Sequence, residues 1–121
     1  MPGWLLVAIG SAFGGVARYG VSTLALRWFG ASLPWGTLAV NVVGSAFIGW
    51  LAASLAPQPA AARLFWMTGL CGGFTTFSAF SLETLTLMRQ GDTARAVAYA
   101  AASLFLCGFA VLSGAWAGRG R

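Results

Sequence analysis

The amino-acid sequence predicts an all-α integral membrane protein with four transmembrane helices, the third of which is broken near its centre. The first observation is composition: 59% of the 121 residues are hydrophobic and 7% are charged, whereas about a quarter of a soluble domain is charged. The second is length, because the apolar residues form four runs of about 20 residues, which is the length that crosses a bilayer core. The third is a stretch rich in glycine, threonine and serine that interrupts the third run.

The four predicted spans cover residues of about 4–26, 33–55, 64–88 and 94–117. They leave no room for a soluble domain, so we expect residues 1–121 to form a single four-helix transmembrane domain. Four helices are too few to enclose a pathway comfortably, and we therefore expect the chain to assemble as a homo-oligomer.

Small residues recur one turn apart in the first span. Gly10 and Gly14 are four residues apart, as are Ser11 and Gly15. Small residues at this spacing allow two membrane helices to approach closely, so the first span is expected to pack tightly against another helix.

A polar stripe runs down the second span, where Thr37, Asn41 and Ser45 follow one another at intervals of four residues. Asn41 is costly in mid-membrane unless its amide is used. Two uses remain open: its NH2 group can donate to an anion, or it can form a hydrogen bond between helices.

The interruption of the third span is the stretch GLCGGFTTFSAFSLE, residues 69–83. Non-helical backbone is tolerated at membrane depth only where protein buries it or where it lines a wet cavity, and such breaks recur at ion sites. We therefore hypothesise an ion or solute pathway. Carbonyls left unpaired at the break would suit a hard cation, or the glycines would serve a tight helix crossing; the residues concerned are Gly72, Gly73, Thr75 and Thr76.

Two aromatic side chains follow the break on one helical face. Phe77 and Phe80 are three residues apart, with Ser78 between them. Aromatic ring edges carry partial positive charge, so a small anion could pass them without being trapped by a full charge. Conduction needs that balance between entry and exit.

The seven basic residues are all arginines and lie singly, mostly at the ends of apolar runs. This is no basic patch, and we expect no nucleic-acid partner. With four spans, each side of the membrane receives three of them: Arg63, Arg119 and Arg121 on one side, and Arg27, Arg89 and Arg95 on the other. Orientation follows an imbalance of such residues, so the even split predicts insertion in both orientations and an antiparallel dual-topology homodimer.

Arg18 and Glu83 are ionisable residues within spans, and such residues are functional candidates by default. Both lie in the later half of spans that run in the same direction, so an ion pair between them is one expectation. The other is a functional charge, with Arg18 raising the anion concentration at a pore mouth. The chain has no histidine and no lysine, so no pair of nucleophile and base can be assembled and we expect no enzyme.

The fourth span follows a polar turn in which Asp92 or Thr93 is expected to cap the helix. Tyr99 and Ser103 fall on one face of this span. Cys71 and Cys107 both lie in apolar runs and are interpreted as small hydrophobic residues.

Three motifs together resemble the small fluoride channel family, Fluc or CrcB: GGVARY (residues 14–19), GTLAVNVVGSAFIG (residues 36–49) and the interrupted stretch of the third span. The resemblance implies a fluoride-selective channel of the bacterial inner (plasma) membrane that exports toxic cytoplasmic fluoride. It implies an antiparallel homodimer in the lipid bilayer, with two pores and a structural sodium ion at the dimer interface.

The resemblance also assigns roles by motif position. The pore asparagine matches Asn41, and the vestibule arginine looks like Arg18. The pore phenylalanines and serine match Phe77, Phe80 and Ser78, with Thr76 beside them, and the polar track of the fourth span matches Tyr99 and Ser103. The sodium ligands would be the backbone carbonyls of Gly72 and Thr75. The chain departs from the pattern at Ala79, where many members have threonine, and at Cys107 and Val111, which continue the track without polar oxygen.

Two alternatives belong to other classes. A small multidrug or guanidinium exporter has a similar length and four spans, but it needs an acidic residue in the first span, where this chain has Arg18. A membrane scaffold without transport is distinguished by whether Asn41, Thr76 and Ser78 face water or are sealed by packing.

Overall fold

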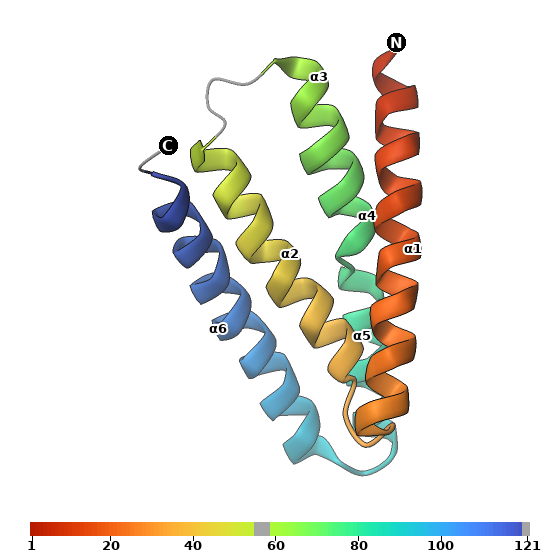
Figure 1. Ribbon diagram of the computed structural model, residues 1–121. Coiled ribbons are helices and arrows are strands. Elements are labelled where there is room, and N and C mark those ends of the chain that lie inside the picture. The colour runs from red at the N-terminus through yellow and green to blue at the C-terminus, as the bar shows by residue number, and fades with distance from the viewer. Residues whose placement is uncertain (55–58, 120–121) are drawn as a thin grey trace.

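A computed structural model of the chain describes residues 1–54 and 59–119, which are helical apart from short turns and one internal break (Figure 1). The predicted end of the second span at Leu55, and Pro57 in the connection after it, lie outside the described residues. The elements in chain order are α1 (Gly3–Phe29), α2 (Trp35–Ser54), α3 (Ala60–Arg63), the π-helical segment η1 (Leu64–Cys71), α4 (Gly72–Phe74), α5 (Phe77–Arg89) and α6 (Thr93–Gly118).

In Figure 1 the bundle is built of rods that alternate in direction along the chain. The elements α3, η1, α4 and α5 follow one another as one interrupted rod, which we call the third rod, and its upper part lies along α1. Helix α6 lies along α2. The N-terminus, the end of α6 and the start of α3 are at the top of the view, and the turns that join α1 to α2 and α5 to α6 are at the bottom.

Three helices, α1, α2 and α6, are long and apolar enough to cross a membrane. The third rod contributes no helix of that length, because its longest helix, α5, has 13 residues. Large apolar side chains point outward from the bundle: Tyr19 on α1 is 74% exposed, and Phe105 on α6 is 78% exposed. A surface of this kind suits contact with lipid or with another subunit.

Glycine brings α1 and the third rod into backbone contact. Gly10 and Gly14 are buried, and a Cβ atom added to Gly14 would overlap the carbonyl oxygen of Leu70. A Cβ atom on Gly73 would lie 2.5 Å from the carbonyl oxygen of Ser11. The predicted tight packing of the first span is confirmed at Gly10, Gly14 and Ser11, and Gly73 of the break takes part in it. Gly15, from the second predicted pair, has nothing within 4 Å of an added Cβ atom.

A second glycine contact joins α2 to α6. Gly114 and Gly118 are buried on α6, and a Cβ atom on Gly114 would overlap the backbone carbonyl of Ala46. Gly49 on α2 meets the carbonyl of Val111 in the same way. The bundle is therefore held by close backbone approach more than by a large hydrophobic core.

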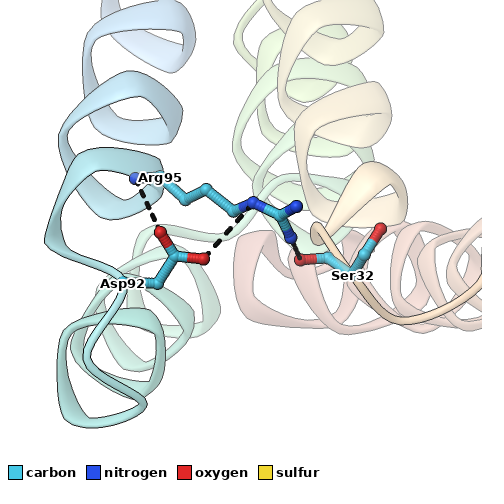
Figure 2. Close-up of polar contacts among 3 residues, drawn as sticks. All are labelled: Ser32, Asp92 and Arg95. Atoms are coloured by element: carbon cyan, nitrogen blue, oxygen red, sulfur yellow. Dashed lines mark hydrogen bonds and ion pairs between the residues drawn. The ribbon is translucent and has the colours of Figure 1, made fainter.

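The turn before α6 is tied to the turn before α2 (Figure 2). Asp92 caps α6 by accepting a hydrogen bond from the Arg95 amide at 3.3 Å, which confirms the predicted cap. The Arg95 side chain forms an ion pair with Asp92 at 3.3 Å and donates to the Ser32 carbonyl at 3.5 Å. Because these groups are exposed, the pair contributes at most about 1 kcal/mol.

Candidate functional site

The centre of the third rod leaves helical geometry for two residues. Helix α4 ends at Phe74, and Thr75 (φ −90°, ψ 160°) and Thr76 (φ −153°, ψ 125°) are extended. The Thr75 hydroxyl donates to the Cys71 carbonyl at 2.9 Å, whereas the Thr76 hydroxyl accepts from the Ala79 amide at 3.1 Å and caps α5. The two threonines thus end one helix and begin the next.

Asn41 on α2 pairs with the backbone of the break. Its Nδ2 donates to the Thr76 carbonyl at 3.0 Å, and its Oδ1 accepts from the Thr76 amide at 2.8 Å. This is the interhelical hydrogen bond that the sequence left as one of two interpretations. An amide NH2 group has two donors, so one N–H remains for another acceptor.

Two of the four candidate carbonyls at the break are already used. The Gly73 carbonyl accepts from Arg18 Nε at 3.1 Å, and the Thr76 carbonyl accepts from Asn41. The carbonyls of Gly72 and Thr75 accept no hydrogen bond from any residue that the structure describes. Their usual helical donors bond elsewhere, since the Thr76 amide binds Asn41 and the Ala79 amide binds the Thr76 hydroxyl.

The expected ion pair between Arg18 and Glu83 does not form within the chain, so that expectation is wrong. Arg18 binds the Gly73 carbonyl, and Glu83 accepts from the Thr37 hydroxyl at 3.0 Å. The physical reason is depth. Arg18 lies level with α4, whereas Glu83 lies roughly two helical turns beyond the break.

A cavity of about 580 Å³ lies beside the break, between α2, the third rod and α6. We call it the break cavity. Its polar lining residues are Asn41, Ser45, Thr68, Thr75, Thr76 and Ser103. Ser78 is exposed, with its hydroxyl 3.3 Å from that of Thr76. Asn41, Thr75 and Thr76 are half-buried at this cavity, whereas Ser103 is buried.

Three aromatic rings form a row that begins with Phe77 and Phe80 in the lining of the break cavity and continues to Tyr99. The ring centroids of Phe77 and Phe80 are 5.5 Å apart, and those of Phe80 and Tyr99 are 5.3 Å apart. Phe77 is 74% exposed, whereas Tyr99 is 5% exposed. The row therefore leads from the outer surface of α5 to the buried face of α6.

Buried polar atoms continue from the aromatic row. Tyr99 Oη, Ser103 Oγ and Glu83 Oε1 have no hydrogen-bond partner within the described part of the chain. Thr37 and Glu83 also line a second cavity, of about 350 Å³, which we call the loop cavity. The sequence pointed to Glu83 as an ionisable functional candidate and to Thr37 as the start of the polar stripe of α2, but it assigned neither residue to the ion pathway.

Comparison with known proteins shows the family to which this site belongs. Residues 5–115 match the family model described as CrcB-like protein, Camphor Resistance (CrcB). The matched segment includes the break, Asn41 and both cavities.

The individual relatives described below match this chain over 80–97% of their own length. A protein of Opitutus terrae is 49% identical over 116 residues, covering 92% of this chain and 88% of its own. One from Hyphomonas neptunium is 46% identical and covers 98% and 97%. One from Methylobacterium radiotolerans is 50% identical and covers 91% and 80%. Each carries the name fluoride-specific ion channel FluC.

The bacterial relatives and the three helices able to cross a membrane confirm the predicted multi-pass bacterial membrane protein. The match of the family model and the identity of the relatives likewise confirm the resemblance drawn from three sequence motifs. The chain belongs to the CrcB family.

Proposed function

We propose that this protein is a passive fluoride channel that exports cytoplasmic fluoride across the bacterial inner (plasma) membrane. The relatives named as fluoride-specific ion channels support the choice of ion. The single observation that carries the proposal from this chain is the break cavity, in which polar donors and aromatic edges lie together.

A fluoride ion that leaves water must exchange its hydration shell for protein donors. Asn41 keeps one N–H beyond its bond to Thr76. The hydroxyls of Thr76 and Ser78 lie together at the same break. These donors are neutral, so they can bind a small anion without holding it as a full positive charge would.

The aromatic row gives the anion its next contacts. The edges of Phe77 and Phe80 carry partial positive charge, and their contact aligns them between the break and α6. Tyr99 and Ser103 follow with hydroxyls that no described residue pairs. A buried hydroxyl without a partner costs about 1–3 kcal/mol, and a passing anion or water would supply the missing acceptor.

Arg18 acts at longer range. Its Nε is held by the Gly73 carbonyl, which places a half-buried positive charge beside the break. A fixed charge at this depth raises the local concentration of anions by attraction. Arg18 is proposed to attract the anion without binding it directly.

The third rod completes the bundle as the third membrane crossing, broken at its centre by Thr75 and Thr76. Arg63 and Arg119 lie at one end of the bundle, and Arg27, Arg89 and Arg95 lie at the other; Arg121, outside the described residues, follows Arg119 in the sequence. The even split of three arginines against three leaves both orientations open. We propose insertion in both and an antiparallel homodimer, with a partner covering part of the exposed apolar surface.

A structural sodium ion would fit the unpaired carbonyls of Gly72 and Thr75. Hard cations prefer oxygen ligands, and the described residues contain no cluster of acidic, histidine or cysteine ligands that would bind a metal instead. Each chain offers two carbonyls, and a second copy across a two-fold axis would double the set. Sodium there would hold the two breaks together. Dimer stability should accordingly fall when sodium is replaced by choline, and a dimer indifferent to that exchange would argue against the site.

The chain is proposed to be a channel and no enzyme, in keeping with the names of its relatives and with its lack of histidine and lysine. Membership of the CrcB family argues against the small multidrug exporter. Selective fluoride release from liposomes tests the proposal, and the accessibility of a C-terminal tag on both sides of the membrane tests the dual topology.

A further inference from the structure

The two cysteines of the chain, Cys71 on η1 and Cys107 on α6, both line the break cavity. Both thiols are free. Their exposure differs, because Cys71 is 3% exposed whereas Cys107 is half-buried. A thiol reacts only where a reagent can reach it, and a fully buried thiol is inert. The difference in exposure therefore makes Cys107 the reactive thiol of the pair.

Cys107 has a hydrogen-bond donor one helical turn before it on α6. Ser103 precedes it by four residues, which places the two side chains on one face of the helix, and both residues line the break cavity. Ser103 is 7% exposed, and its Oγ has no hydrogen-bond partner among the described residues. A buried hydroxyl without a partner gains stability when an acceptor reaches it. The α6 wall of the break cavity thus combines a nucleophile with an unused donor.

The space beside Cys107 suits a small neutral molecule. The break cavity has a volume of about 580 Å³, and a Cβ atom added to the neighbouring Gly108 would meet nothing within 4 Å. The α6 wall around Cys107 is otherwise apolar, with Leu104 and Val111 among the lining residues. Burial of an unpaired charge against such a wall is costly, so a neutral reagent is favoured over a charged one.

We propose that Cys107 is a covalent modification site for small, neutral α,β-unsaturated carbonyl compounds that enter the break cavity. The thiol gives its proton to water, and Sγ forms a bond to the β-carbon of the reagent as the carbon–carbon double bond opens. The Ser103 hydroxyl donates to the carbonyl oxygen, on which negative charge develops. The α-carbon then takes a proton from water, and no group leaves. The adduct occupies the break cavity and blocks fluoride passage, a consequence that rests on the proposed function.

Labelling of the purified full-length protein in detergent tests the site, with N-ethylmaleimide as the probe and peptide mass spectrometry as the readout. Folded wild-type protein should be labelled at Cys107 at least about tenfold faster than at Cys71. Cys71→Ser is the matched control and should keep the Cys107 rate within about twofold of wild type. Ser103→Ala should slow labelling of Cys107 several-fold, because it removes the donor to the carbonyl oxygen. Folded wild-type protein that is labelled at neither cysteine, or at both equally fast, would overturn the modification site.

Fluoride efflux from proteoliposomes, measured for each protein before and after the same reagent, tests the block. Efflux through wild type and Cys71→Ser should fall at least about tenfold on labelling, whereas efflux through Cys107→Ser should not change. Protein that is labelled at Cys107 and conducts as before would refute the block. Protein that is labelled at Cys107 but releases no fluoride even before labelling would refute the proposed function and support the modification site. If Cys107→Ser fails to fold, the labelling rates of the two cysteines in wild type still decide the site.

Discussion

Asn41 and Thr76 bind each other through two hydrogen bonds, one from Asn41 Nδ2 to the Thr76 carbonyl at 3.0 Å and one from the Thr76 amide to Asn41 Oδ1 at 2.8 Å. The side chain thereby satisfies both backbone groups of a residue that has left the helix. It also fixes α2 against the break and leaves one N–H beside the break cavity. One side chain thus stabilises the break and takes part in the proposed pathway.

Asn41→Asp separates these two roles. The carboxylate still accepts from the Thr76 amide, but it loses the donor and adds a negative charge beside the cavity. Fluoride efflux from liposomes should fall at least about tenfold, because one tenfold step in rate corresponds to only about 1.4 kcal/mol. Ser54→Ala, in the last turn of the same helix and outside the break cavity, should retain efflux within about twofold. Normal efflux from the Asn41→Asp channel would remove Asn41 from the pathway.

Phe80→Ile tests the aromatic row. Isoleucine keeps apolar bulk but lacks the ring edge that meets Phe77 and Tyr99. We expect fluoride efflux to fall several-fold while the protein elutes at an unchanged position in size-exclusion chromatography. Phe105→Ile removes a ring that is 78% exposed on α6 and should leave efflux unchanged. If the two variants conduct equally well, the ring of Phe80 has no special role.

Gly14→Ala tests the close contact between α1 and the third rod. The new Cβ atom would overlap the Leu70 carbonyl, and overpacking of this kind costs about 1–3 kcal/mol. Thermal unfolding in detergent should therefore shift to lower temperature. Gly15→Ala is the matched control, because a Cβ atom there meets nothing within 4 Å and alanine favours helix by about 0.5–1 kcal/mol. A variant pair with the opposite order of stability would refute this packing.

Arg18→Gln tests the long-range role of the arginine charge. The glutamine amide can still donate to the Gly73 carbonyl, so thermal stability should change little. The positive charge is lost, and fluoride efflux should fall, most clearly at low ionic strength where screening is weak. Arg27→Gln, in the last turn of α1, removes a charge far from the break and should have a smaller effect. Equal efflux from wild type and Arg18→Gln would leave Arg18 with a structural role alone.

The helical membrane class and the departure from helix at Thr75 and Thr76 could be predicted from composition and from the run of small polar residues. These features depend on the residue types in one local segment, which can be read directly from the sequence. The cap at Asp92 was predictable for the same reason. The close approach at Gly14 followed from the spacing of small residues.

The partners of Arg18, Asn41 and Glu83 could not be predicted. Spacing gives the face of a helix and an approximate depth, but it does not give the rotation of one helix about another. Depth alone suggested a pair between Arg18 and Glu83, whereas the break offers Arg18 an unpaired carbonyl at a nearer level. The hydrogen bond between Thr37 and Glu83 also depends on how two helices are rotated about each other. No sequence motif predicts that rotation.

The break cavity is proposed to serve a fluoride-selective pathway, and ion efflux from proteoliposomes measures such a pathway directly. The purified protein is placed in liposomes loaded with fluoride, and in a parallel trial with chloride, and release is followed with ion-selective electrodes. We expect rapid release of fluoride and none of chloride. Well-folded protein that releases neither ion, or releases both equally, would rule out a fluoride-selective pathway.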